Sequence, residues 1–479
     1  MSDADSTRHS PHSLAPAGAS ARALLSSIWS AAGGPAQVLS RIEFSGAGDL
    51  PSVFAVTDLA AASVGAAGAA VAELVAALFD ELPAVRVDRR LASFWFSTSL
   101  RPLGWTLPPQ WDAIAGDYAT ADGWIRLHTN APHHRAAALA VLDLSGDETA
   151  GNGPDKARVA EAVSGWQAEA LESAVVAQGG CAAAMRSMQA WAEHPQGCAV
   201  AAEPLLATTV LEAGPRRVYA GTRARPLAGV RVLDLTRVLA GPVATRFLAG
   251  HGADVLRIDP PAWDEPSLAP EITLGKRCAR LDLRDAHDRS CFEQLLGQAD
   301  VLVHGYRSDA LDRLGYDAQA RRRLCPGLID VSLDAYGWSG PWRGRRGFDS
   351  LVQMSSGIAE AGMRRLGRDR PTPLPVQALD HATGYLLAAA VVRGLTLRAR
   401  SGAGCATRAS LARMAMLLTG APMDAQGAMA AETLEDQAPA IEATTWGPAH
   451  RLMPPVTVEG APMQWVYPAG PLGNAPAAW

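Results

Sequence analysis

From residue 226 onward, short apolar runs alternate with helical patterns, and this alternation constrains the fold more than any other feature of the sequence. Residues 230–236, Val-Arg-Val-Leu-Asp-Leu-Thr, form a mostly apolar run between Gly229 and a Leu-Ala-Gly-Pro turn. Such a run is typical of a strand buried on both faces of a parallel sheet. Further strands are predicted at residues 254–258, 278–283, 300–303 and 328–332, with helices at 243–250 and 285–298. The alternation predicts an α/β fold, a Rossmann-like doubly wound parallel sheet with right-handed crossovers.

A smaller α+β unit is predicted ahead of this sheet. Asp122-Gly123 is a hairpin signal with strand-like residues on both sides, between residues 116 and 128. Helical patterns follow at residues 133–142 and 156–178.

The 479 residues are too many for one compact core, so the chain is expected to form several domains. The predicted parts are a flexible tail (1–20), a helical segment that partly repeats the large domain (21–109), the small α+β domain (110–206), a linker (207–225), the Rossmann-like domain (226–420) and a C-terminal extension (421–479). The repeat rests on residues 53–58 and 376–380, each of which ends in Asp and leads into an Ala-rich helix. It indicates a domain duplication.

Composition excludes several classes of protein. The formal net charge of −5 gives no global basic field, so neither nucleic acid nor an anionic membrane surface is an expected partner. The six cysteines include no C-x-x-C pair, which excludes a disulfide framework or zinc site and favours a reducing, cytoplasmic location. The histidines have no metal-ligand spacing either, so no metal is expected. The apolar stretch 59–79 consists mainly of Ala and Gly and contains Glu73, so it predicts a packed helix rather than a membrane span.

Six motifs between residues 226 and about 414 occur in the order found in the class III CoA-transferases, the CaiB/BaiF-type family. That family includes formyl-CoA and carnitine-CoA transferases and α-methylacyl-CoA racemases. The motifs are Pro226-Leu-Ala-Gly-Val-Arg-Val-Leu-Asp-Leu-Thr-Arg-Val-Leu-Ala-Gly-Pro242, Gly252-Ala-Asp-Val-Leu-Arg-Ile-Asp-Pro260, Gly275-Lys-Arg277 with Leu281-Asp-Leu283, Ala299-Asp-Val-Leu-Val-His-Gly-Tyr306 with Ala310-Leu-Asp-Arg-Leu-Gly315, Tyr336-Gly-Trp-Ser-Gly-Pro341 with Gly347-Phe-Asp349, and Leu379-Asp-His-Ala-Thr-Gly384. The chain therefore resembles this family. The unit around Gly123 looks like the family's small domain, but it precedes the nucleotide-binding part instead of following it, and it is expected to pack over the active-site cleft.

The resemblance implies that Asp380 is a covalent nucleophile, because it occupies the position of the family's catalytic aspartate. A carboxylate can accept an acyl group as a mixed anhydride and then carry CoA as a thioester. Free N–H groups at the predicted helix start could stabilise charge there. From the residues alone, Asp380 reads as an N-cap, which typically contributes about 1 kcal/mol. Asp58 has the same local setting but no preceding CoA-binding strand unit, and we interpret it as a structural relic.

Coenzyme A, as acyl-CoA, is the expected substrate, and a carboxylic acid is the expected second partner. The resemblance places the CoA contacts on Val238, Leu239, Ala240, Arg277, Leu281, Tyr306 and Arg313. The first three follow a predicted strand, as expected for ligands bound outside the carboxyl ends of parallel strands. Tyr306 would face the adenine and Arg313 a phosphate; from the residues alone they read equally well as a core aromatic and a solvated Arg. Leu239 stands where formyl-CoA transferase has a polar amide.

The predicted function is an acyl-CoA:carboxylate CoA-transferase that works through an aspartyl anhydride and an aspartyl-CoA thioester. One alternative is a racemase-like enzyme, but Phe348 occupies the position of its proton-shuttling His, and a phenyl ring cannot carry a proton. A non-catalytic CoA-binding or scaffold homologue is another alternative. The family forms interlocked homodimers, whereas a fused duplication could supply both lobes within one chain.

Overall fold

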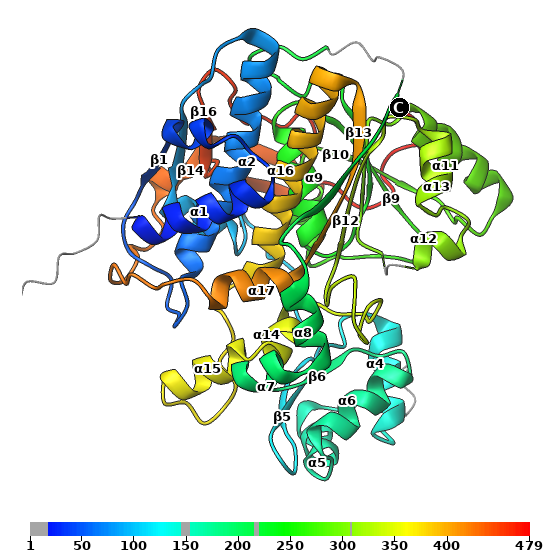
Figure 1. Cartoon of the computed structure of the whole chain (residues 1–479). Coiled ribbons are helices and arrows are strands. Elements are labelled where there is room, and N and C mark those ends of the chain that lie inside the picture. The colour runs from blue at the N-terminus through cyan, green and yellow to red at the C-terminus, as the bar shows by residue number, and fades with distance from the viewer. Residues whose placement is uncertain (1–17, 145–153, 215–219, 307–308) are drawn as a thin grey trace, which may run out of the picture.

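The computed structural model describes residues 18–144, 154–214, 220–306 and 309–479, and its main feature is a seven-stranded, mostly parallel sheet (Figure 1). The predicted tail, residues 1–20, lies outside the described residues except for its last three. The strands, in spatial order, are β10 (Lys276–Arg280), β9 (Asp254–Asp259), β8 (Arg231–Leu235), β11 (Val301–His304), β12 (Ile329–Asp334), β13 (Ala403–Ser410) and β7 (Ala207–Ala213). Neighbours are parallel except β7, which runs antiparallel to β13. The predicted mixed α/β class is confirmed.

Strand order creates a switch point in this sheet. The chain leaves β8 toward β9 and β10 on one side, then returns to place β11 on the other side of β8. Connections at the carboxyl ends of β8 and β11 therefore diverge and leave room for a ligand.

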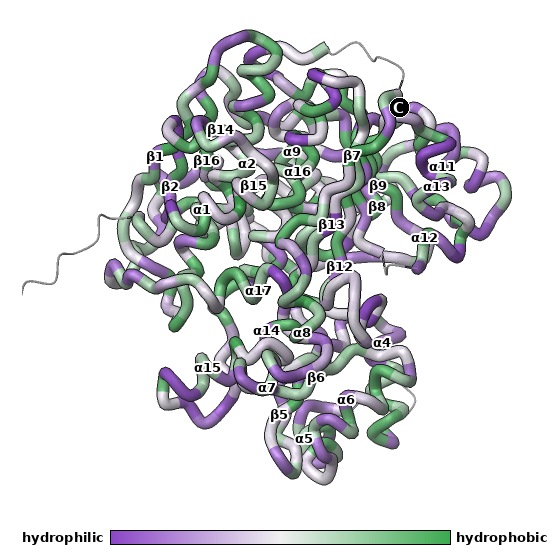
Figure 2. The backbone as a smooth tube through the Cα atoms, viewed as in Figure 1, coloured by the Kyte–Doolittle hydropathy of each residue, from purple (hydrophilic) through white to green (hydrophobic). Residues whose placement is uncertain are grey.

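Apolar side chains of the strands alternate between two cores. Val232, Val255 and Val303 face the larger core, whereas Leu233 and Leu256 face a second core on the opposite side of the sheet. Helices α9 (Ala240–Gly250) and α16 (Ala378–Ser401) pack in the first core, and α11 (Ala286–Gln298) packs in the second. Figure 2 shows hydrophobic residues gathered around α9 and α16 and hydrophilic residues on the outer helix α11.

The first core also contains the long helix α2 (Val56–Phe79), which packs along α16. Both helices are 24 residues long. Each begins after the same tight turn: Ala55 has φ −73° and ψ 57°, and Gln377 has φ −74° and ψ 62°. Each ends at a residue with a left-handed backbone, Asp80 or Gly402.

By length and composition α2 is the one described helix that could cross a membrane, yet 78% of its most apolar window is buried inside the protein. The prediction of a packed helix over residues 59–79 is confirmed, because its small Ala and Gly side chains allow close packing against α16.

A three-stranded antiparallel sheet forms the lower part of the molecule in Figure 1, with five helices around it. Its elements are β4 (Gly116–Ala119), β5 (Trp124–Leu127), β6 (Ala182–Ala184), α4 (Pro132–Val141), α5 (Lys156–Ser164), α6 (Ala168–Ala177), α7 (Met188–Glu193) and α8 (Pro195–Ala202). The predicted hairpin at Asp122-Gly123 joins β4 and β5. The helical pattern predicted over residues 156–178 corresponds to two helices, α5 and α6, with a break between residues 164 and 168.

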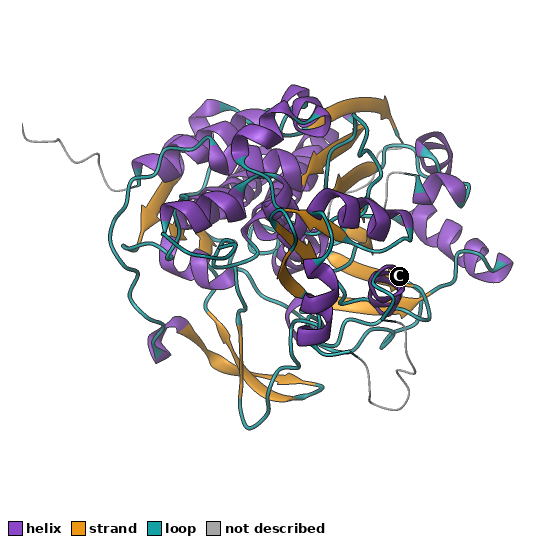
Figure 3. Cartoon of the chain, turned by 90° about the horizontal axis from the view of Figure 1, so that it is seen from below, coloured by secondary structure: helices purple, strands orange, loops and turns teal. Residues whose placement is uncertain are grey.

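The two ends of the described chain are interleaved in two small sheets. Figure 3 shows strands, in orange, in several separate groups among the helices. One contains β1 (Ile42–Ser45), β2 (Val85–Asp88) and β16 (Val456–Val458), and the other contains β3 (Leu100–Pro102), β14 (Gln437–Thr444) and β15 (Gly447–Leu452). The N-terminal helices are α1 (Ala19–Ala31) and α3 (Arg89–Trp95), and the remaining helices of the main body are α10 (Ala269–Ile272), α12 (Ala310–Arg313), α13 (Ala318–Leu324), α14 (Asp349–Ser355), α15 (Ile358–Arg365) and α17 (Leu411–Thr419). Residues 421–479 are therefore integrated into the main body.

The linker predicted at residues 207–225 is wrong over its first third. Residues 207–213 form β7 and complete the edge of the main sheet. The sequence gives little signal for this strand because β7 is largely exposed and lacks the apolar alternation of a buried strand.

Candidate active site

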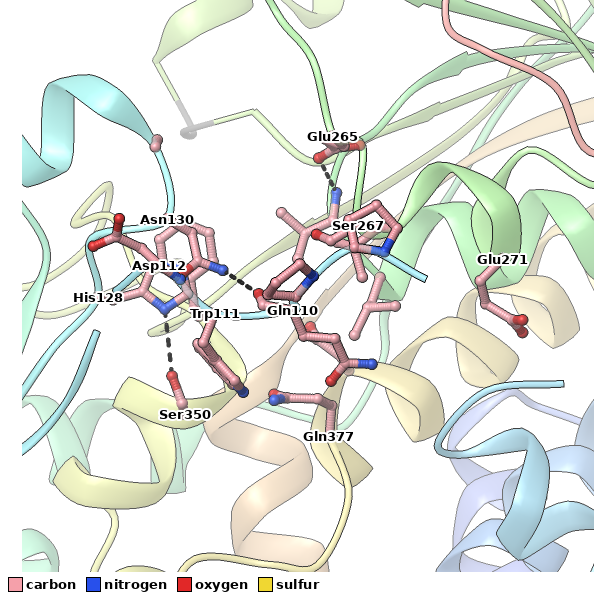
Figure 4. Close-up of a pocket in the computed structure, with 18 of the residues that line it drawn as sticks. Gln110, Trp111, Asp112, His128, Asn130, Glu265, Ser267, Glu271, Ser350 and Gln377 are labelled. Carbon is pink, nitrogen blue, oxygen red and sulfur yellow. Dashed lines mark hydrogen bonds between the residues drawn. The ribbon is translucent and has the colours of Figure 1, made fainter. Parts of the chain in front are cut away.

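A cavity of about 900 Å³ lies where segments from distant parts of the chain meet, at the carboxyl end of β8 (Figure 4). Its walls come from residues 238–239 and 262–268 beside the main sheet, residues 348–354 and 373–380 around α14 and the start of α16, residues 107–133 of the small unit, and residues 96–98. Residues 110–206 thus contribute a wall to a cavity that also contains Asp380.

Asp380 is the third residue of α16 and lines this cavity, although only 6% of the residue is exposed. Within the part of the chain that the structure describes, its carboxylate makes no hydrogen bond or ion pair. Burial and the neighbouring Asp349 carboxylate raise the pKa of Asp380 well above its ordinary value. A carboxylate in this state is poorly stabilised and therefore chemically available.

Asp349 fixes the start of α16. One of its oxygens accepts hydrogen bonds from the backbone N–H groups of Leu379, at 2.8 Å, and Asp380, at 3.0 Å. Its other oxygen accepts from the side-chain amide of Gln353. Burial raises the pKa of Asp349 to about 6 despite these donors. The donors favour the anionic form of Asp349, so the higher pKa of the pair belongs to Asp380.

Backbone N–H groups at this helix start are not free, contrary to the prediction. Asp349 occupies those of Leu379 and Asp380. The N–H of Ala378 donates to Val376 and that of His381 to Gln377. A donor for developing negative charge must therefore come from a side chain. The amide of Gln377 lines the cavity three residues before Asp380 and makes no side-chain hydrogen bond within the described residues.

Asp58 occupies the same position in α2 as Asp380 in α16, but its surroundings differ. Arg89 donates to its carboxylate at 2.7 and 3.2 Å, and the two side chains are 3% and 4% exposed. Arg89 is the first residue of α3, directly after the N-cap Asp88. In the other half, Leu411 is the first residue of α17, directly after the N-cap Ser410. An arginine therefore neutralises Asp58, whereas an apolar residue stands at the corresponding position near Asp380.

His381, next to Asp380, is directed into the interior. Its ring stacks on Phe96 with centroids 5.1 Å apart, and neither ring nitrogen has a partner among the described residues. Burial lowers the pKa of His381 to about 3. The imidazole is therefore neutral and packs as a core aromatic.

Val238 and Leu239 line the cavity, and the first helical residue, Ala240, lies beside them in the core. Val238 has φ 63°, a conformation that is strained for a β-branched residue. The carboxylate of Glu265 accepts the backbone N–H of Val238 at 2.7 Å, and Arg257 holds Glu265 at 2.6 Å. This buried network maintains the turn that presents residues 238 and 239.

The other predicted CoA contacts do not line the cavity. Arg277 lies near the amino end of β10 and pairs with Asp254 at 2.8 Å, whereas the cavity lies at the opposite end of the parallel strands. Leu281 is buried in the second core, and Arg313 is exposed and pairs with Asp309. Tyr306 lies outside the cavity at the end of β11.

Arg237 is a candidate phosphate-binding residue that the sequence did not single out. It follows β8, and its guanidinium lies 4.2 Å from the ring centroid of Trp263 and 5.0 Å from that of Tyr306. Its Nε is buried without a partner within the described part of the chain. The available signal was its position directly after a buried strand, where ligand contacts are expected.

No group of three or more His, Cys, Asp or Glu side chains within the described ranges could hold a metal ion. All six cysteines are free thiols, in agreement with the absence of a disulfide framework.

The sheet and the cavity define a mixed α/β protein with an unpaired carboxylate beside its switch point. Residues 227–450 match CoA-transferase family III, which confirms the resemblance that the sequence motifs indicated. The matched range contains Val238, Asp349 and Asp380 and excludes the small unit.

Several known proteins resemble parts of this chain. An acyl-CoA transferase of Gibberella moniliformis is 28% identical over 331 residues, which are 63% of this chain and 58% of that protein. A succinyl-CoA:glutarate CoA-transferase of Mus musculus is 32% identical over 195 residues, 38% of this chain and 44% of that protein. The crystal structure of Rv3272 from Mycobacterium tuberculosis is 31% identical and covers 40% of this chain and 56% of that one, with a TM-score of 0.37. The chain spans about half the length of the curated relatives it matches.

Proposed function

We propose that this protein transfers CoA between an acyl-CoA and a carboxylic acid, with Asp380 as the covalent nucleophile. The observation that carries this proposal is the Asp380 carboxylate, which is buried and unpaired among the described residues and opens into the cavity that Val238 and Leu239 also line. A residue that served only the structure would have a partner, as Asp58 does.

The reaction proceeds in four displacements. The Asp380 carboxylate attacks the thioester carbonyl, the C–S bond breaks, and CoA leaves as a thiolate while a mixed anhydride forms. The thiolate then attacks the Asp380 carbonyl, which releases the first acid as its carboxylate and leaves an aspartyl-CoA thioester. The second acid attacks this thioester and expels the thiolate again. Finally, the thiolate attacks the acyl carbonyl of the new anhydride, which yields the new acyl-CoA and restores the Asp380 carboxylate.

Chain residues support these steps in specific ways. Asp349 orients the start of α16 and raises the basicity of Asp380. Gln377 is positioned to donate to the developing oxyanion, and removing one such donor typically lowers kcat by about 10²–10³-fold. Arg237 is suited to a CoA phosphate, since it carries no ion pair within the described residues and two aromatic rings hold it.

A fused duplication explains the order of the domains along the chain: the small domain of the first copy precedes the Rossmann-like domain of the second. The matching turns, lengths and aspartate positions of α2 and α16 support this order, as does the start of the family match at residue 227, after the small unit. One chain then supplies both walls of the cavity. The free thiols fit a reducing, cytoplasmic location.

A direct assay tests the transferase. The protein is incubated with a panel of acyl-CoAs and carboxylic acids, and new acyl-CoA species are followed by chromatography. We expect transfer with the wild type, loss of at least 10³-fold in Asp380→Ala, and retention in Asp58→Asn measured below its melting temperature. Full activity in Asp380→Ala would exclude the mechanism.

Proton exchange at the α-carbon of an acyl-CoA is the second candidate, and His128 is the observation that favours it. Its ring lines the cavity and stacks on Phe348, the residue at the position of the racemase His, with centroids 3.8 Å apart. Burial lowers the pKa of His128 to about 3, so the ring is neutral. In D₂O, a transferase leaves the α-hydrogen of a branched acyl-CoA unexchanged; rapid exchange that disappears in His128→Ala would favour the racemase.

A further inference from the structure

The wall that the small domain contributes to the cavity is a polar stripe. Arg126, His128 and Asn130 alternate along β5 and its extension, and all three line the cavity. The intervening residues Leu127 and Thr129 are buried, and Leu127 packs with Ile125, which precedes Arg126, in the core of the small domain. Period-two alternation therefore places the polar residues on one face, toward the site.

Arg126 is the only lysine or arginine among the described residues that line the cavity. Its Nη1 donates to Asp117, its neighbour across the β4–β5 pair, at 2.7 Å. Its guanidinium lies 4.6 Å from the ring centroid of Trp111. These contacts hold the side chain, but Nε is buried without a partner, and Nη2 makes no hydrogen bond within the described ranges. Nη2 is therefore the donor that remains available, and it can make a charge-assisted hydrogen bond to a carboxylate oxygen.

The carboxylates around the cavity would repel an acid that had no cation to bind. Four of them already have basic partners: Asp112 pairs with Arg135, Asp117 with Arg126, Glu265 with Arg257 and Glu271 with Arg246. Asp264 is exposed at the rim. A second negative charge on a substrate would therefore lie best beside Arg126, the basic residue of the described cavity lining, which it would share with Asp117.

Arg126 also lies on the side of the cavity that holds the nucleophile. His128, two residues along the stripe, stacks on Phe348, and Phe348 directly precedes Asp349. Asp349 in turn accepts the N–H of Asp380. The charge of Arg126 acts on Asp349 and contributes to lowering its pKa against the effect of burial.

We propose that Arg126 binds the remote carboxylate of a dicarboxylic acid, so that the enzyme prefers short dicarboxylates over monocarboxylates of equal length. The inference rests on the transferase function proposed above and adds the class of acid. The hydrocarbon tail of a monocarboxylate at this place would remove water from the guanidinium and from Asp117. It would offer no hydrogen bonds in place of that water, which is unfavourable.

The test compares matched acids. Transfer from acetyl-CoA is measured to succinate, glutarate and adipate and to butyrate, pentanoate and hexanoate, for the wild type, Arg126→Gln, Arg126→Lys and the control Arg158→Gln, which removes an exposed guanidinium from α5 of the same domain. We expect Arg126→Gln to lower kcat/KM for the best dicarboxylate about 10- to 100-fold, with Arg126→Lys intermediate. Its kcat/KM for monocarboxylates should change less than about 3-fold, and Arg158→Gln should match the wild type.

Each other outcome has a defined meaning. A wild type that prefers monocarboxylates, or equal losses for both series in Arg126→Gln, would overturn the inference and leave the transferase intact. Equal losses would mean that Arg126 supports the fold or holds the reacting carboxylate. No transfer to any acid by the wild type would contradict the transferase proposal itself, and this inference with it.

Discussion

At the scale of single residues, two aspartates in equivalent helical positions have opposite surroundings. Asp58 pairs with Arg89, whereas Asp380 faces a cavity, and the charged group that acts on it within the described residues is the Asp349 carboxylate. The sequence identified Asp380 through its motif and could set Asp58 aside only because no strand unit precedes it. The difference depends on which residue stands 31 positions after each aspartate: Arg89 after Asp58, and Leu411 after Asp380. Only the fold shows that a residue so distant in the sequence, Arg89, reaches Asp58.

Substituting each aspartate by asparagine should change stability in opposite directions. Asp58→Asn leaves the buried Arg89 with one carboxylate partner among the described residues, Asp49 at 3.1 Å, so we expect a loss near the lower end of about 3–5 kcal/mol. Asp380→Asn removes a desolvated charge, so we expect a melting temperature that is higher by a few degrees at pH 7. The folded pKa of Asp380 lies above its unfolded value, so the wild type loses stability as pH rises above about 4. The advantage of Asp380→Asn should therefore grow with pH and vanish below pH 4, as calorimetry between pH 3.5 and 8 can establish. An Asp380→Asn variant less stable than the wild type at pH 7 would mean that the carboxylate has a stabilising partner.

Asp349 should control the pH at which the enzyme becomes active. Its negative charge raises the pKa of Asp380, so Asp349→Asn should lower that pKa and shift the acidic limb of kcat/KM to lower pH. The asparagine oxygen can still accept the N–H groups of Leu379 and Asp380, which keeps the helix start in place. An acidic limb that stays unchanged or moves to higher pH would exclude electrostatic coupling of the two groups.

At the scale of secondary-structure elements, the apolar runs predicted five of the six parallel strands, with boundaries within a few residues. The strands β13 and β7 lacked this signal. Residues 403–410, Ala-Gly-Cys-Ala-Thr-Arg-Ala-Ser, contain few strongly apolar side chains, yet they form β13 because β12 and α16 bury them. The polar stripe of Arg126, His128 and Asn130 was also missed, since three polar residues at alternate positions indicate a ligand only when a cavity faces them.

Contact between α9 and α16 sets the distance between the turn at Val238 and Leu239 and the side chain of Asp380. A Cβ added at Gly384 in α16 would lie 2.5 Å from the carbonyl oxygen of Ala240 and 2.8 Å from Cβ of Val243, both in α9. Gly384→Ala should therefore push the helices apart, cost about 1–3 kcal/mol of stability and lower kcat/KM for acyl-CoA by about 10- to 100-fold. Gly165→Ala is the control, because no atom lies within 4 Å of its added Cβ. Steady-state kinetics and thermal melts check both; unchanged kinetics in Gly384→Ala would show that the spacing of the helices is not critical.

At the scale of the whole molecule, the walls of the cavity come from both halves of one chain. Residues 107–133 and 373–380 meet there although about 250 residues separate them in the sequence. The resemblance predicted a small domain over the cleft, but interlocked dimers and a single chain that supplies both lobes remained equivalent from the sequence. In the structure of the single chain, residues from both halves line one cavity.

Complementation between inactive chains tests this arrangement. If the cavity is completed within each chain, co-expressing Asp380→Ala with Arg126→Gln should not restore dicarboxylate transfer, because each site retains its own defect. Should two chains exchange small domains, mixed dimers would contain one intact site and recover up to about a quarter of wild-type activity under random pairing. Separately purified and mixed variants serve as the control, measured as transfer to the dicarboxylate that the wild type uses best.

Capture of the covalent intermediate tests the central claim most directly. The protein is mixed with acyl-CoA, quenched with hydroxylamine or borohydride, digested and analysed by mass spectrometry. An acyl-CoA-dependent hydroxamate or alcohol at Asp380, absent from Asp380→Asn and present in Asp58→Asn, is the predicted result. Active wild-type enzyme that carries no modification at Asp380, or carries it at another residue, would contradict the account.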